Sequence, residues 1–289
     1  MEPVVTVGLD GSPESLAAAD WAAEEAERRT LALHMLHAWP SLAPEPARLP
    51  AEADQNYWAN RLVRTACTEV EARHPSLSIV TDLVADDAET ALLDAASRSE
   101  MLVLGSRGLA PAESYFLGDV SLPVVARAQR PVVLVRADTQ QDEPAPAATE
   151  GVVAALKLRG SCDDLLDFAF RSATARQVPL RVVHGRSVPL HARGSGGVDH
   201  TVAVEMARDA HDRLAEVLRP WREKYPGVAV KPVFRVDGPA GAVAEASTGA
   251  ALLVVGRRRH RTGRMSHLGP VAQAAVHHGR CPVAVVPHD

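Results

Sequence analysis

The chain has 289 residues, of which 46% are hydrophobic and 23% charged, and its formal net charge is −5. No apolar run approaches the roughly eighteen residues of a membrane helix, and the negative charge gives no general attraction to nucleic acid or acidic membranes. The first residues lack a signal-peptide pattern, and three separated cysteines form no CxxC pair. We therefore expect free thiols in a soluble, cytoplasmic protein that is long enough for two domains.

Strands and helices alternate along the first half of the sequence. A buried strand is predicted over residues 4–9, and Ser12 followed by Pro13 is typical of a helix start, here for a helix over residues 16–29. Further strands are predicted over residues 31–37, 78–84, 101–104 and 131–135, and further helices around residues 58–70, 92–96 and before Arg130. Asp87 is predicted to cap the helix that carries Leu92. This alternation predicts βα units and a parallel sheet.

The second half repeats the first after a segment rich in Gln, Asp, Glu, Pro and Ala. The distance from Gly105 to Pro131 equals that from Gly256 to Pro282, and the distance from Asp10 to His37 equals that from Lys157 to His184. We interpret the chain as a tandem duplication. The predicted organisation is a first domain over residues 1–137, a linker over 138–150 and a second domain over 151–289.

A glycine-rich loop follows the predicted strand 101–104. It reads Gly105-Ser106-Arg107-Gly108, then nine residues, then Gly118-Asp119-Val120-Ser121 at the start of a predicted helix. Glycine lets the backbone approach a ligand closely, and free amides at a helix start attract anions. The loop is therefore predicted to bind phosphate.

These features together resemble the universal stress proteins. The resemblance rests on the sequence Val-Gly-Leu-Asp-Gly-Ser at residues 7–12, the alternating βα units, Gly-x2-Gly-x9-Gly in the first half, and a final strand in each half, Pro-Val-Val-Leu-Val at residues 131–135 and Pro-Val-Ala-Val-Val at residues 282–286. It implies an α/β fold of two tandem Rossmann-like domains of the adenine-nucleotide α-hydrolase type, each a five-stranded, mostly parallel sheet between helices. It also implies an internal pseudo-dimer of the two halves and allows a homodimer.

The resemblance implies one adenine-nucleotide site in the first half, with ATP as the expected ligand. The residues that match the family's site are Gly8, Asp10, Ala38, Leu104, Gly105, Gly108, Gly118, Asp119, Val120 and Ser121. Asp119 departs from the pattern, because ATP-binding members carry Ser or Thr there. Its carboxylate would repel a triphosphate unless Mg²⁺ lies between them; alternatively, Asp119 only caps the helix.

The second half departs from the pattern at each diagnostic position. Lys157 replaces Asp10, Arg259 replaces Gly108, and Pro270, which has no amide hydrogen, follows Gly269. We therefore expect the second half to be degenerate as an ATP site and to serve mainly as a structural partner of the first.

The strongest charge cluster is the run Arg257-Arg258-Arg259-His260-Arg261. It could contact an anion or RNA, but no aromatic residues are interleaved, so we favour a solvated loop that pairs with the acidic excess of the other half. The histidines show no metal-ligand spacing, and no nucleophile or water-activating residue can be assigned. The sequence thus favours a regulatory adenine-nucleotide-binding stress protein over a slow ATPase; the alternative is a scaffold that binds no nucleotide and acts through protein contacts.

Overall fold

The computed structural model describes residues 3–39, 55–106, 120–137, 151–158, 160–187, 193–194, 197–198, 200–236, 238–259 and 268–289. The chain divides into two compact units, residues 1–141 and 142–289, and the boundary falls in the predicted linker. Cys67, Cys162 and Cys281 are free cysteines. None of the helices in the described ranges combines the length and apolarity needed to cross a bilayer.

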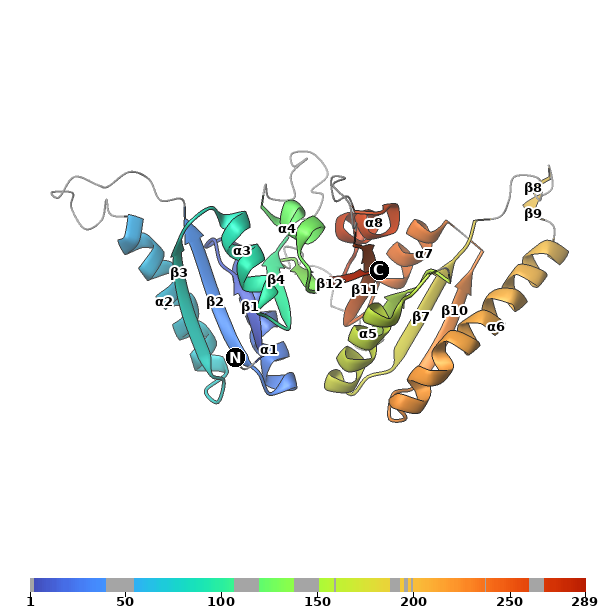
Figure 1. The fold of residues 1–289 in the computed structure, drawn as a ribbon, viewed down its shortest axis with the longest axis horizontal. Coiled ribbons are helices and arrows are strands. Elements are labelled where there is room, and N and C mark those ends of the chain that lie inside the picture. Colours follow the sequence, from blue (N-terminus) through green and yellow to red (C-terminus); the bar gives the residue numbers. More distant parts are fainter. Residues whose placement is uncertain are drawn as a thin grey trace. The chain divides into compact units, whose positions relative to one another are not determined.

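The first unit is built on a parallel five-stranded sheet (Figure 1). Its strands are β1 (Val4–Gly8), β2 (Ala32–Trp39), β3 (Ile79–Ala85), β4 (Met101–Gly105) and β5 (Val132–Val135), in the spatial order β5-β4-β1-β2-β3. The helices are α1 (Pro13–Arg29), α2 (Gln55–Arg73), α3 (Ala88–Ser97) and α4 (Ser121–Arg127). Helices α1 and α2 pack together over one face, and α3 packs with α4 and against β1, β2 and β4 on the other.

Local sequence explains where the helices of the first unit begin. Ser12 is the N-cap of α1 and accepts a hydrogen bond from the Ser15 amide, while Pro13 occupies the first helical position, where its missing amide hydrogen costs nothing. Asp87 caps α3 in the same way through the Thr90 amide at 3.0 Å. Both caps are as predicted from the sequence.

The second unit has the same architecture. Its strands are β6 (Val152–Ala155), β7 (Leu180–Gly185), β10 (Val230–Arg235), β11 (Leu252–Arg258) and β12 (Val283–His288), all parallel, in the order β10-β7-β6-β11-β12. Helices α5 (Asp163–Arg176) and α6 (His200–Lys224) pack together, with α7 (Pro239–Ala246) and α8 (Pro270–His278) forming a second pair. The short strands β8 (Arg193–Gly194) and β9 (Gly197–Val198) form a separate antiparallel pair.

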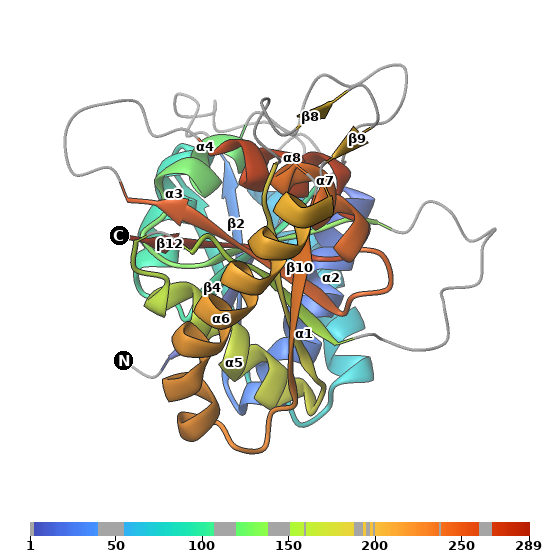
Figure 2. The same cartoon turned by 90° about the vertical axis from the view of Figure 1, so that its right-hand side faces the viewer.

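Helix α6 packs against the sheet of the second unit through one apolar stripe. In Figure 2 it runs in front of β10, against which it packs. Four of its buried residues recur at intervals of four, Met206, Ala210, Leu214 and Leu218, and form one apolar stripe. With five parallel strands and flanking helices in each of two units, the prediction of two tandem α/β domains is confirmed.

Candidate functional site

The candidate site lies where β1, β2 and β4 end, because ligands of parallel sheets bind at the carboxyl ends of the strands. Asp10 follows β1, and its Oδ1 accepts hydrogen bonds from the Ser12 amide at 2.9 Å and the Ser12 hydroxyl at 2.5 Å. Gly11 between them has φ +81°, a conformation that favours glycine. The exposed Asp10 carboxylate is therefore held in a defined turn.

A histidine joins this turn to the neighbouring strand. The Leu9 amide donates to the Leu36 carbonyl at 2.8 Å, and His37 Nδ1 lies 2.7 Å from the Leu9 carbonyl oxygen. Because a carbonyl can only accept, Nδ1 carries the hydrogen in this contact. His37 thus fixes the segment that carries Asp10 against the end of β2.

Two of the predicted site glycines allow close packing of the backbone. A Cβ on Gly105 would lie 2.6 Å from the Glu14 carbonyl carbon and 2.7 Å from the Ser15 nitrogen, so only glycine lets the end of β4 approach the first turn of α1. A Cβ on Gly8 would lie 2.8 Å from Leu104 Cδ2. Gly8 and the buried Leu104 side chain therefore pack against each other.

Two serines lie at the ends of the glycine loop. The Ser121 hydroxyl donates to the Gly105 carbonyl at 3.5 Å, which brings together the first and last predicted residues of the loop. Ser106 is 4% exposed, and its hydroxyl has no hydrogen-bond partner among the described residues. A buried hydroxyl in this state is a candidate donor to a ligand. Ser106 was not selected from the sequence, although its place directly after Gly105 is the signal that could have found it.

The remaining predicted residues divide into two groups. Ala38 lies in β2 opposite Val84 of β3, and Val120 directly precedes α4. Gly108, Gly118 and Asp119 lie outside the described residues. Within the described ranges, no group of three or more His, Cys, Asp or Glu side chains could hold a metal ion.

The second unit repeats the histidine contact, which identifies equivalent positions. The Leu156 amide donates to the Val183 carbonyl at 2.9 Å, and His184 Nδ1 lies 2.8 Å from the Leu156 carbonyl oxygen. Leu156 is therefore the structural equivalent of Leu9. It follows that Lys157 stands where the first unit has Asp10, as the repeat spacing predicts.

The arginine run of the second unit differs from the sequence expectation. Strand β11 continues through Arg258, which pairs with His288 of β12. Arg257 is 3% exposed, and burial, followed by the charge of Arg259, lowers its pKa. The expectation of a solvated loop is thus wrong for Arg257, because continued strand pairing buries it; His260 and Arg261 lie outside the described residues.

Arg259 is held by carboxylates of its own unit. It donates to Asp164 in the first turn of α5 at 2.9 Å and lies 3.6 Å from Asp289. The expected pairing with the acidic excess of the other half is therefore wrong for this arginine.

Gly269 precedes α8, and Pro270 is the first residue of that helix, so one amide hydrogen is missing at its start.

Comparison with known proteins relates both halves of the chain to one family. The model of the universal stress protein family matches residues 3–136 and 150–287. The universal stress protein Rv2005c of Mycobacterium tuberculosis is 33% identical, covering 97% of this chain and 96% of its own.

Solved structures extend this comparison. A universal stress protein from Archaeoglobus fulgidus has a TM-score of 0.67 at 16% identity, covering 99% of this chain and 98% of its own. A universal stress protein solved in complex with cAMP is 26% identical over 47% of this chain and 98% of its own, with a TM-score of 0.38. With the family model matched once in each half, the chain belongs to the universal stress protein family.

Proposed function

We propose that the first unit binds an adenine nucleotide, with ATP as the first candidate, and that the protein acts in a stress response through this binding. The observation that carries the proposal is the Asp10 carboxylate, held in its turn by Ser12 at the end of β1. The adjacent strand β4 ends at Gly105, which has no room for a side chain. A fixed acceptor beside the start of a glycine-rich loop suits a nucleoside with its phosphates.

Each described residue of the site has a chemical part in this proposal. The Asp10 carboxylate accepts hydrogen bonds from the ribose hydroxyls or the adenine amino group. The Ser106 hydroxyl, at one end of the glycine loop, donates to a phosphate oxygen. The Ser121 hydroxyl, at the other end, turns from its 3.5 Å contact with the Gly105 carbonyl to donate to a second phosphate oxygen. If the nucleotide is ATP, the proposal also requires Mg²⁺, which would be bound between the Asp119 carboxylate and the phosphates. The proposed role is regulatory binding, and it includes no catalytic step.

The second unit, in the same proposal, does not bind the nucleotide. Lys157 offers an ammonium group where Asp10 offers an acceptor, and a cation cannot accept a hydrogen bond from ribose or adenine. The Arg259 guanidinium donates a hydrogen bond to Asp164, and we propose that it does not bind phosphate. One site per chain is therefore expected.

The experiment is a comparison of nucleotides on the purified full chain. Bound nucleotide is first extracted and identified, and ATP, AMP, cAMP and GTP are then titrated by calorimetry with and without Mg²⁺. The proposal expects the adenine nucleotides to bind more tightly than GTP, and Asp10→Asn to weaken them about tenfold or more by removing a charged acceptor. A wild-type chain that binds no adenine nucleotide would contradict it.

A further inference from the structure

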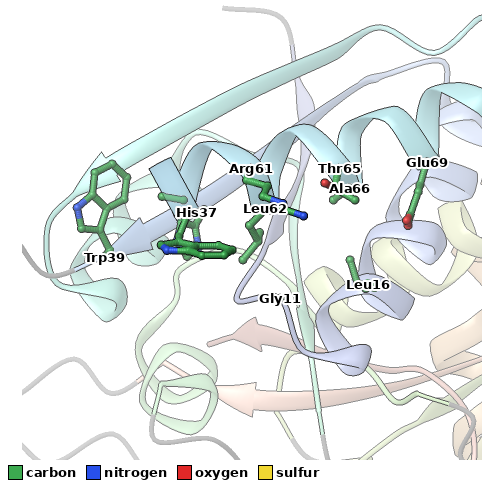
Figure 3. A pocket seen from close by; sticks show the side chains of 11 residues that line it. Gly11, Leu16, His37, Trp39, Arg61, Leu62, Thr65, Ala66 and Glu69 are labelled. Carbon is green, nitrogen blue, oxygen red and sulfur yellow. The ribbon is translucent and has the colours of Figure 1, made fainter. Parts of the chain in front are cut away.

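A second concave site lies in the first unit, beside the proposed nucleotide site. It is a cleft of about 600 Å³, which is within the usual size range of small-molecule pockets (Figure 3). Its lining residues come from the β1–α1 turn, the end of β2 and helix α2: Gly11, Leu16, His37, Trp39, Trp58, Ala59, Arg61, Leu62, Thr65, Ala66 and Glu69. None of the predicted nucleotide residues that the structure describes lines this cleft.

Strand alternation separates the cleft from Ala38. Successive side chains of a strand point to opposite faces, so His37 and Trp39 share one face of β2 while Ala38 points to the other. Helices α1 and α2 both pack against β2. Leu16 of α1 and Leu62 of α2 line the cleft together with His37 and Trp39, so these helices lie on the face of β2 that carries His37 and Trp39. His34, on the Ala38 face, contacts Asp82 of β3 at 3.8 Å. The cleft is therefore distinct from the surroundings of the Ala38 side chain.

The walls of the cleft are aromatic at one end. The rings of His37 and Trp39 are stacked with centroids 6.0 Å apart. Trp58 also lines the cleft, yet it is 52% exposed, and an exposed indole beside a cavity is typical of a surface that a ligand covers. Flat rings of this kind bind other flat rings by offset or edge-on contact.

A cation, the Arg61 side chain, lies beside these rings. The Arg61 guanidinium lies over the Trp58 ring, 5.5 Å from its centroid. Among the described residues, no carboxylate lies within ion-pair distance of Arg61, whereas Arg73 on the same helix pairs with Asp20. A guanidinium that is already oriented by an aromatic ring is well suited to bind a carboxylate through two parallel hydrogen bonds.

The acidic residue of the cleft lies away from this cation. Glu69 follows Arg61 by eight positions on α2, a rise of about 12 Å along a helix, and Figure 3 shows it at the opposite end of the cleft from Trp39. A hydrogen bond to Asp20 is the main cause that raises the pKa of Arg73, and the charge of Glu69 adds to it. Glu69 thus has a basic neighbour and leaves the Arg61 end suited to an anion.

We propose that this cleft binds a small planar aromatic carboxylate, with the ring between Trp39 and Trp58 and the carboxylate on Arg61. The assignment rests on the charge complementarity of Arg61 and on the aromatic walls, and it does not depend on nucleotide binding. The ligand class is defined by its chemistry, namely a flat ring that carries one negative charge.

The test uses 2-naphthoate as the probe, titrated into the full chain by calorimetry. We expect saturable binding that weakens about tenfold or more in Arg61→Gln and for the neutral analogue 2-naphthamide, because each removes the charge-assisted pair. Arg64→Gln is the matched control, since Arg64 lies on the same helix outside the cleft lining, and it should leave binding unchanged. Thr65→Trp, which fills the cleft from an exposed helix position, should abolish binding.

The result that overturns the proposal is 2-naphthoate binding that is absent, or equal in wild type, Arg61→Gln and Thr65→Trp. Displacement of 2-naphthoate by ATP would also overturn it, because the cleft would then be part of the nucleotide site. The two proposals fail separately: Asp10→Asn should leave 2-naphthoate binding intact, and Arg61→Gln should leave ATP binding intact. Circular dichroism of each variant confirms that it is folded.

Discussion

Arg259 Nη1 donates to Asp164 Oδ2 at 2.9 Å, and this contact joins the end of β11 to the first turn of α5. Arg259 lies three residues beyond Gly256, the repeat equivalent of Gly105. Both glycines lie close to the first helix of their unit: a Cβ on Gly105 would lie 2.7 Å from the Ser15 nitrogen, and a Cβ on Gly256 would lie 3.0 Å from Leu165 Cδ1. The second repeat therefore shares this close approach and adds a side-chain ion pair at Arg259, where the first repeat has Gly108.

Breaking this ion pair should cost little stability. Both side chains are partly exposed, at 31% and 49%, and pairs of this kind contribute about 0.2–1 kcal/mol. A double-mutant cycle of Arg259→Ala and Asp164→Ala, measured by urea unfolding, should give a coupling in that range that shrinks in 1 M NaCl. Arg258→Ala is the control, and it should show no coupling to Asp164. A coupling of zero at low salt would show that the pair contributes nothing.

Adding a single methyl group at Gly105 should disturb the first unit. In Gly105→Ala, the new Cβ meets the α1 backbone at 2.6 Å, so the two elements must separate, at an expected cost of about 1–3 kcal/mol. Hydrogen exchange should report faster exchange in α1 and β4 and unchanged exchange in α5 and β6. Gly227→Ala, where nothing lies within 4 Å of the new Cβ, is the control. Equal effects of the two substitutions would contradict this account of Gly105.

A part-buried histidine should make stability depend on pH. Burial lowers the pKa of His34 from 6.5, Asp82 acts against this shift, and the charge of Arg98 adds to it. His34 Nδ1 also lies 3.2 Å from the Thr6 hydroxyl. Because the unfolded chain binds the proton first, the stability contributed by neutral His34 is present above pH 6.5 and is lost as the pH falls below that value.

The measurement for this prediction is urea unfolding between pH 5 and pH 8. One proton allows a slope of at most about 1.4 kcal/mol per pH unit, and His34→Gln should remove part of the wild-type slope below pH 6.5. His211→Gln, at an exposed position on α6, serves as the comparison. A slope that is the same in wild type and His34→Gln would refute the assignment.

Features set by neighbouring residues could be predicted from the sequence. The Ser12-Pro13 start of α1 and the Asp87 cap depend on contacts within three residues, and both are present as expected. The equivalence of Asp10 and Lys157 was predicted from repeat spacing, and the paired contacts of His37 and His184 agree with it.

Features set by distant partners could not be predicted. Strand β2 runs to Trp39 because β3 pairs with it as far as Ala85, and β11 runs to Arg258 because β12 extends to His288. The contact of Arg259 with Asp164 spans 95 residues of sequence. The cleft beside Trp58 likewise depends on how α2 packs against β2, which the four-residue spacing of its apolar positions does not specify.

The most direct test of the central claim is calorimetric titration of Mg-ATP into wild type, Asp10→Ala and Lys157→Ala. The two variants alter equivalent positions of the two units, so each is the control for the other. We predict one site per chain, affinity at least about tenfold weaker in Asp10→Ala, and wild-type affinity in Lys157→Ala. Two sites per chain, or equal loss of binding in both variants, would contradict a single nucleotide site in the first unit.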